Sequence, residues 1–240
     1  MAATADFLVE IGTEELPPKS LADLEHAFAG QVGDGLRGAG LGFAGLSSYA
    51  TPRRLAVLVS GLTLTQPVQL IEKRGPPVVV AFAADGSPTR AALAFAEGCG
   101  LPIERIGRVE TAKGAWLFHS AQSPGRPAAE LLHGIVTAAL AALPIPRRMR
   151  WGSGDAEFVR PVHWVVMLLG DVVLPEPVLG ITPGRMTRGH RFHAPEELVI
   201  GSPADYPILL SGRGKVIPEY RTRRDRVLRL ANAAALAAGG

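Results

Sequence analysis

Short apolar runs alternate with longer amphipathic stretches along this chain of 240 residues. The runs at residues 7–11 and 164–169 are short and almost entirely apolar, which predicts buried strands. In residues 20–38 and 131–143 the apolar side chains recur every three or four positions, which predicts helices with one buried side. Strands and helices are therefore mixed along the sequence, as in an α+β fold.

Glycine and proline divide the rest of the chain into shorter elements. Strands are predicted at 46–50, 55–62, 108–111, 115–121, 171–174, 178–181 and 198–200, and helices at 88–98 and 218–238. Residues 72–77 break the pattern and are predicted to form a linker or a rigid loop. We expect an α+β class with small mixed or antiparallel sheets flanked by helices, a second half richer in strands, and a basic helix at the end.

These predicted elements divide the chain into four segments. They are 1–70 as an α+β unit, 71–150 as a helix–hairpin–helix unit, 151–215 as a β-rich unit with the basic motif, and 216–240 as the basic helix. An apolar content of 47% excludes general disorder, and no apolar run approaches the roughly 20 residues of a membrane-spanning helix. The single cysteine, Cys99, can form no internal disulfide, which fits a reducing cytoplasm.

Basic residues gather in the second half of the chain. Residues 146–195 contain seven arginines and four acidic residues, with aromatic and histidine side chains among them. Guanidinium groups beside flat rings suit phosphate binding and base stacking, so a polyanion such as RNA is the expected partner. The simpler alternative is that these charged residues form a solvent-exposed surface around a buried core strand. Residues 213–229 hold seven basic and two acidic residues, which could face RNA, another protein or solvent.

Motifs of catalysis are incomplete in this sequence. Residues 212–215 read Gly-Arg-Gly-Lys but lack the first glycine and the spacing of a P-loop. A metal-dependent hydrolase built on His163, His190 and His193 is one alternative, although the neighbouring arginines would repel a dication. The adjacent pair Glu14–Glu15 is expected to stabilise the start of a helix rather than to catalyse. We therefore expect no catalytic residue, no metal and no cofactor on this chain.

Six sequence blocks carry a resemblance to a known family. The blocks are 7–18 (FLVEIGTEELPP), 50–57 (ATPRRLAV), 72–76 (EKRGP), 144–152 (PIPRRMRWG), 158–164 (FVRPVHW) and 187–193 (TRGHRFH). In the same order, they resemble the N-terminal third of the beta subunit of the bacterial heterotetrameric glycyl-tRNA synthetases.

The resemblance implies an enzyme whose work is divided between two polypeptides. In this family the alpha subunit activates glycine with ATP and Mg²⁺, while the beta subunit binds tRNA(Gly) within an alpha2–beta2 tetramer in the cytoplasm. The later HD-like and anticodon-binding domains have no counterpart in this sequence, so we expect the chain to be inactive alone. An alternative role is a purely structural scaffold for the alpha subunit without direct tRNA contact. The residues predicted to contact RNA are Arg147, Arg148, Arg150, Trp151, Arg188, His190, Arg191 and Phe192.

Overall fold

The computed structural model describes residues 3–112 and 114–239, which form two compact units. Unit 1 combines Met1–Gln66 with Arg126–Gly240, and unit 2 is Pro67–Gly125. Each of the four segments predicted from the sequence is one continuous stretch of the chain. The units are defined by spatial contacts, and unit 1 combines two separate stretches. The first strand of the chain pairs with residues 162–169, so the first and third predicted segments share one sheet.

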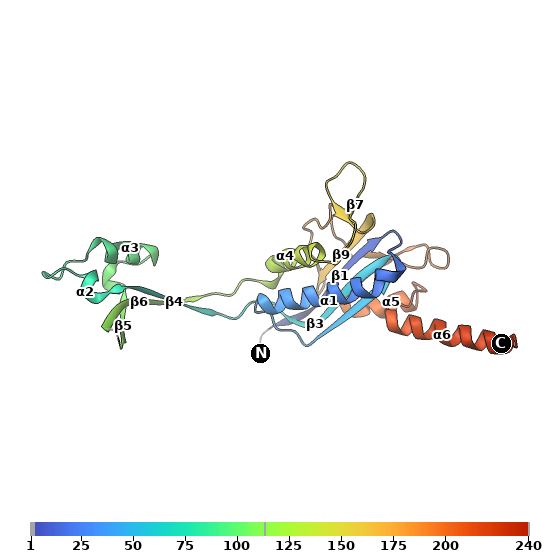
Figure 1. Ribbon diagram of the computed structural model, residues 1–240, viewed down its shortest axis with the longest axis horizontal. Coiled ribbons are helices and arrows are strands. Elements are labelled where there is room, and N and C mark those ends of the chain that lie inside the picture. Colours follow the sequence, from blue (N-terminus) through green and yellow to red (C-terminus); the bar gives the residue numbers. More distant parts are fainter. Residues whose placement is uncertain (1–2, 113, 240) are drawn as a thin grey trace. The chain divides into compact units, whose positions relative to one another are not determined.

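A five-stranded antiparallel sheet forms the centre of unit 1 (Figure 1). In order across the sheet its strands are β10 (Val172–Val173), β9 (Val162–Leu169), β1 (Thr4–Thr13), β3 (Arg54–Thr63) and β2 (Gly45–Thr51). The central strand β1 places Glu10 opposite Ala56 of β3 and opposite Val166 of β9. The neighbours of β1 therefore come from widely separated parts of the sequence.

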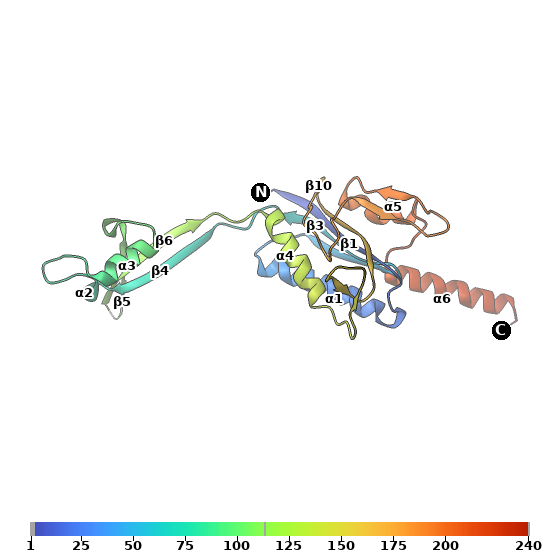
Figure 2. The same cartoon turned by 90° about the horizontal axis from the view of Figure 1, so that it is seen from above.

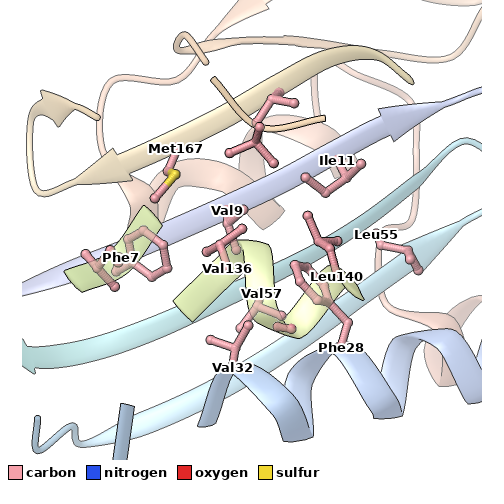
Figure 3. Close-up of a cluster of buried hydrophobic side chains, with 14 of the residues drawn as sticks. Phe7, Val9, Ile11, Phe28, Val32, Leu55, Val57, Val136, Leu140 and Met167 are labelled. Atoms are coloured by element: carbon pink, nitrogen blue, oxygen red, sulfur yellow. The ribbon is translucent and has the colours of Figure 1, made fainter. Parts of the chain in front are cut away.

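Both faces of the sheet are covered (Figure 2). On one face, α1 (Leu21–Gly38) and α4 (Ala128–Ala141) bury Phe7, Val9 and Ile11 of β1, as Figure 3 shows. On the other face, residues after β9 cover Leu8 and Glu10 of the same strand. Successive side chains of a strand point to opposite faces, so a strand covered twice is apolar along its whole length. Glu10 is the charged exception among the buried residues of β1.

The second covering layer is built from short elements. They are β11 (Met186–Arg188), β12 (Glu197–Val199), the 3-10 turn η3 (Pro203–Asp205) and α5 (Tyr206–Ser211). Leu198, Tyr206 and Leu210 from this layer pack with Leu8 of the central strand. The layer also fixes the course of residues 187–193, which complete β11, begin the loop before β12 and belong to the basic motif.

Two further elements of unit 1 carry arginines at its surface. The hairpin of β7 (Met149–Arg150) and β8 (Glu157–Phe158) follows α4. The helix α6 (Tyr220–Ala237) has no buried residue and runs away from the sheet in Figure 1. Among the described residues, no helix is long and apolar enough to cross a bilayer.

Unit 2 is a three-stranded antiparallel sheet with short helices. Its elements are β4 (Gln69–Pro77), α2 (Val78–Ala81), α3 (Arg90–Gly98), the 3-10 turn η2 (Ile103–Arg105), β5 (Gly107–Thr111) and β6 (Gly114–Ser123), with sheet order β4-β6-β5. Its small core includes Ala92, Ala96 and Leu117. Unit 1 holds the flanking residues together, because the backbone N–H of Gln66 donates to the carbonyl of Arg126 at 3.0 Å.

The α+β class, the antiparallel sheets and the final helix are confirmed. The prediction of a linker at residues 72–77 is wrong, because this run forms most of β4 and pairs with β6. The strand predicted at 178–181 is only an isolated bridge between Val178 and Ile181. The second half is not richer in strands. Beyond Gly125, the described strands other than β9 have two or three residues, since Gly and Pro interrupt them.

Gly12→Ala is expected to destabilise unit 1, because the indole of Trp164 lies directly over this glycine. A Cβ on Gly12 would stand 1.9 Å from the Trp164 ring, so the ring or the strand would have to move. We expect a loss of about 3 kcal/mol or more in the free energy of unfolding, at the upper end for an overpacked core. Urea denaturation measures it.

Gly30→Ala is the matched control, because a Cβ at this position of α1 meets no atom within 4 Å. It should stabilise the chain by roughly 0.5–1 kcal/mol, as alanine does in helix interiors. Equal losses in the two variants would contradict the account of Trp164 over Gly12.

Candidate functional site

A buried ion pair joins the central strand β1 to its neighbour β3, and hydrogen bonds connect this pair to the second covering layer. The Arg54 Nη1 atom lies 3.1 Å from the Glu10 Oε1 atom, and both side chains are almost wholly inaccessible to solvent. The hydroxyl of Thr187 donates to the same carboxylate oxygen at 2.9 Å. Burial raises the pKa of Glu10, whereas the Arg54 charge and the Thr187 hydroxyl oppose that rise.

Arg54 also holds the end of β11. Its Nη2 atom donates to the backbone carbonyl of Arg188. The Arg54 and Arg188 guanidinium carbons lie 5.8 and 5.4 Å from the ring centroid of Trp164, within the range of cation–π contacts. One buried arginine of β3 thus positions both the core tryptophan and the start of the 187–193 block.

Exposed charges form a second cluster at the end of β1. We call it the Glu14 network; its members are Glu14, Glu15, Arg53, His163 and Arg191. The His163 Nε2 atom lies 2.8 Å from a Glu14 oxygen, and the Arg191 Nη2 atom lies 3.3 Å from Glu15 and 3.7 Å from Glu14. Arg53 approaches Glu14 at 3.7 Å and Glu15 at 3.9 Å. The two carboxylates therefore connect three segments that are far apart in sequence.

The Glu14 network replaces the expected role of the glutamate pair at a helix start. The helix α1 begins at Leu21, and the acidic residue of its first turn is Asp23. Desolvation acts to raise the pKa of Glu14, but the charges of Arg53 and His163 outweigh it, so the pKa is lowered. Glu14 therefore favours its charged form more strongly in the folded state than in the unfolded chain.

A cavity of 430 Å³ lies beside the Glu14 network, and we call it the Phe192 cavity. It is lined by Glu15, residues 51–54, Trp164, residues 189–192, residues 215–217 and Arg223. Five of these residues are cationic and one is acidic, and the Phe192 side chain is 79% exposed. This combination of excess positive charge with an accessible ring suits an anionic ligand with a flat group.

His190 has a fixed ring orientation in the wall of the Phe192 cavity. Its Nδ1 atom accepts hydrogen bonds from the backbone N–H groups of Phe192 and His193, both at 3.2 Å. In the neutral ring the proton must therefore sit on Nε2, which remains a donor. The backbone N–H of His190 in turn donates to the carbonyl of Gly214 at 2.7 Å, tying the two loops of the wall together.

A larger open cavity of 790 Å³ lies between the start of α1 and the β7–β8 hairpin, and we call it the Arg147 cavity. It is lined by Pro17, Ser20, Leu24, residues 144–150, Val159 and Arg160. Four of its described lining residues are arginines and none is acidic. The Arg148 Nη2 atom donates to the carbonyl of Ala141 at the end of α4, and the Arg160 Nε atom donates to the carbonyl of Glu15.

The structure places six of the eight residues predicted to contact RNA in two separate sites. Arg147, Arg148 and Arg150 line the Arg147 cavity, and His190, Arg191 and Phe192 line the Phe192 cavity. Two of the eight lie elsewhere. Trp151 is half-buried against the main core, and Arg188 contacts the Trp164 ring and reaches a Glu197 oxygen at 3.5 Å.

The sequence did not predict several other residues that line the Phe192 cavity. Arg53 and Arg54 lie in the 50–57 block, and Lys215 lies in the Gly-Arg-Gly-Lys segment, but neither run predicts proximity to residues 189–192. In the described part of the chain, no group of three His, Cys, Asp or Glu side chains is arranged to hold a metal ion. His163, which the hydrolase alternative required, is bound to Glu14 instead.

Comparison with known proteins finds sequence similarity over nearly the whole length of this chain. A family profile described as "Glycyl-tRNA synthetase beta subunit" matches residues 7–240. Curated proteins named "Glycine--tRNA ligase beta subunit" are 48% identical in Marinobacter nauticus and in Haemophilus influenzae, and 47% identical in Edwardsiella ictaluri. These similarities cover 98–99% of this chain but 34% of each relative. The chain thus spans about one third of the length of the curated relatives that it matches.

Glu10→Ala is expected to destabilise the chain strongly, because it leaves the Arg54 charge buried without its partner. Removing one member of a buried ion pair typically costs about 3–5 kcal/mol. The control is Glu197→Ala, which removes an exposed partner of Arg188 and should cost less than about 1 kcal/mol. Both free energies come from urea denaturation at neutral pH. Similar small losses would show that Glu10 does not hold the layers together.

Glu14→Gln is expected to make the free energy of unfolding less dependent on pH in the acidic range. The folded pKa of Glu14 lies below its ordinary value of 4.5, so the unfolded state binds more protons between those two values. The resulting stability is present above pH 4.5 and is lost as the pH falls through the folded pKa. The effect should be under about 1 kcal/mol, because the side chains are partly exposed.

The measurement is the free energy of unfolding of both proteins between about pH 6 and about pH 3, the range that brackets glutamate titration. The wild-type curve should fall more steeply on acidification than the Glu14→Gln curve. Parallel curves would contradict the lowered pKa.

Proposed function

The chain belongs to the glycyl-tRNA synthetase beta subunit family, and from this premise we propose that it is a tRNA-binding and assembly portion of a glycine–tRNA ligase. In this proposal the reaction itself takes place on the alpha subunit, which uses ATP and Mg²⁺ to activate glycine. The present chain contributes contacts to tRNA(Gly) within a cytoplasmic alpha2–beta2 tetramer. Its own share of the work is binding and positioning, with no bond-making step.

The observation that carries the proposal is the composition of the Arg147 cavity. Its described lining contains four arginines without an acidic side chain. No salt bridge of Arg147 is found among the described residues, and the Arg150 guanidinium reaches only Asp155, at 3.9 Å and in an exposed position. Free guanidinium groups in an open concave surface favour a polyanion, because each can bind phosphate oxygens through two N–H groups.

The remaining arginines of the Arg147 cavity support the same assignment. Arg148 and Arg160 are fixed by hydrogen bonds to backbone carbonyls of Ala141 and Glu15. A guanidinium held in this way loses little further side-chain freedom when it binds a phosphate, which lowers the entropic cost of binding. We assign phosphate contacts to Arg147 and Arg150 first, with Arg148 as a preoriented neighbour.

The scaffold alternative has one observation in its favour. The helix α6 exposes Val227, Leu228, Leu230 and Leu236, whose exposed fractions range from 47% to 75%. Exposed apolar side chains on one helix suit contact with another protein surface rather than with RNA. Under this alternative the chain would hold the alpha subunit through α6 and leave tRNA untouched.

Replacing Arg147, Arg148 and Arg150 with alanine should weaken tRNA(Gly) binding by the reconstituted alpha–beta complex. We expect roughly a 10- to 100-fold loss of affinity at moderate salt, because up to three arginine–phosphate interactions disappear. The slope of log affinity against log salt should fall by about one for each phosphate that is no longer bound. Filter binding over a series of salt concentrations measures both quantities.

The charge-matched control replaces Arg37, Arg90 and Arg105, none of which lines either cavity. This control should leave affinity and salt slope nearly unchanged. Association with the alpha subunit is followed separately by sedimentation. If the first variant binds tRNA normally but fails to join the alpha subunit, the scaffold alternative replaces the proposal.

A further inference from the structure

The Phe192 cavity has the size of a site for one small molecule or one nucleotide. Its volume of 430 Å³ falls in the lower part of the range of about 300–1,000 Å³ that small-ligand pockets occupy. A double-stranded RNA surface needs a much wider contact area. The charged and aromatic groups of the cavity therefore form a set that can surround a single compact ligand.

Among the described residues, two cations of the Phe192 cavity have no carboxylate partner. In the described part of the chain, neither Lys215 nor Arg223 forms a salt bridge, and Lys215 is exposed. Arg223 is half-buried and donates to the carbonyl of Ile217 at 2.8 Å, while Glu25 acts on its charge from a greater distance. Lys215 is thus the least compensated charge in the cavity wall.

Two other cations are paired but keep spare donors. Arg191 reaches Glu14 and Glu15 through the single atom Nη2, and Arg53 reaches them through Nη2 and Nε. A guanidinium carries five N–H groups, so each arginine retains donors that the carboxylates do not use. These pairs are 3.3–3.9 Å long and partly exposed, so an entering anion can displace them at little cost.

This donor set suits a phosphate monoester better than a phosphodiester. A terminal phosphate has three free oxygens and a charge of about −1.5 to −2 at neutral pH. An internal phosphodiester of RNA has two free oxygens and a single charge. Lys215 and Arg223 can balance the extra charge, and Arg53, Arg191 and the Nε2 donor of His190 can serve the additional oxygen.

The aromatic side chain of the cavity adds a place for a base. The ring of Phe192 is 79% exposed, although phenylalanine is normally buried. It lies 6.1 Å from the His190 ring, centroid to centroid, so the ring is attached to a wall that backbone hydrogen bonds keep in place. Exposed rings beside cationic groups bind bases by stacking.

The backbone of Lys215 is held in an unfavourable conformation at this wall. Its φ angle is +54°, in the left-handed region that favours glycine. The neighbouring backbone fixes it, because the N–H of Gly214 donates to Leu209 and the N–H of Val216 donates to Leu210, both at 2.9 Å. Glycine would fit this backbone without strain, so the lysine found here motivates a functional assignment of its ammonium group.

We propose that the Phe192 cavity binds a nucleoside 5′-monophosphate, either as a free nucleotide or as the phosphorylated 5′ end of an RNA. The phosphate lies among Lys215, Arg191, Arg53 and Arg223, and the base stacks on Phe192. Binding of the free nucleotide is independent of the proposed tRNA role. Binding of the RNA end rests on that role and gives it a definite point of contact.

Lys215→Gly tests the phosphate contact without endangering the fold, since glycine suits the positive φ. Isothermal titration calorimetry of the full chain with GMP, AMP, guanosine and inorganic phosphate gives the affinities. We expect GMP or AMP to bind at least tenfold tighter than guanosine, and Lys215→Gly to remove most of that difference. Its melting temperature should not fall. The matched control Arg213→Ala removes a cation two residues away that does not line the cavity, and should change nothing.

Phe192→Ala tests the base contact. This exposed side chain can be removed without loss of stability, and nucleotide affinity should fall about tenfold, as is typical when a stacking ring is removed. Affinity for inorganic phosphate should stay unchanged. If GMP and AMP bind no tighter than guanosine, or if neither variant changes their affinity, the proposal is overturned. Inorganic phosphate binding as tightly as both nucleotides would also overturn it.

Paired oligoribonucleotides of one sequence, with a 5′-phosphate or a 5′-hydroxyl, distinguish the two sources. Tighter binding of the phosphorylated RNA than of GMP assigns the site to an RNA end, and the reverse assigns it to the free nucleotide. The tRNA-binding proposal fails separately. It fails if the complex does not bind tRNA(Gly) while the Phe192 cavity still binds GMP, whereas normal tRNA binding without nucleotide binding defeats only the present inference.

Discussion

The buried contact between Glu10 and Arg54 is the constraint on which the rest of unit 1 depends. Two charged groups buried from solvent must stay together, since each alone would be very costly in an apolar interior. Arg54 in turn binds the backbone at the end of β11, which fixes the position of the layer over the second face of the sheet. Apolar packing alone would tolerate small shifts of this layer, whereas a charge pair with defined partners does not.

This constraint determines where the surface charges meet. Arg54 binds the Arg188 carbonyl and so fixes the direction of the chain after this residue. The following residues bring Arg191 close to Glu14 and Glu15. The same acidic loop separates the Phe192 cavity from the Arg147 cavity, because Glu15 lines the first and its carbonyl binds Arg160 of the second. The two basic surfaces are therefore joined through one rigid turn of the chain rather than through a flexible linker.

Much of the fold could be predicted from apolar spacing, and little of the site could. The runs at 7–11 and 164–169 predicted the strands β1 and β9, because strands covered on both faces are mostly apolar. The strand β4 was not predicted, since Glu72, Lys73 and Arg74 are consecutive charged residues without the apolar–polar alternation of a strand. Pairing between β1 and β9 and the buried position of Arg54 depend on contacts across more than 100 residues, which no local pattern contains. Hence six of the eight predicted residues were divided between two cavities, and Trp151 and Arg188 line neither of them.

Unit 2 enters the chain between Gln66 and Arg126, at two positions that already touch through a backbone hydrogen bond. To the surrounding fold, the whole insertion is equivalent to a tight turn, because closing a loop becomes only slowly more costly as it lengthens. Evolution can therefore enlarge, trim or exchange this module without rebuilding its host. The sheet and the basic cavities would be inherited intact, while the insertion would be free to diverge among lineages at its own rate.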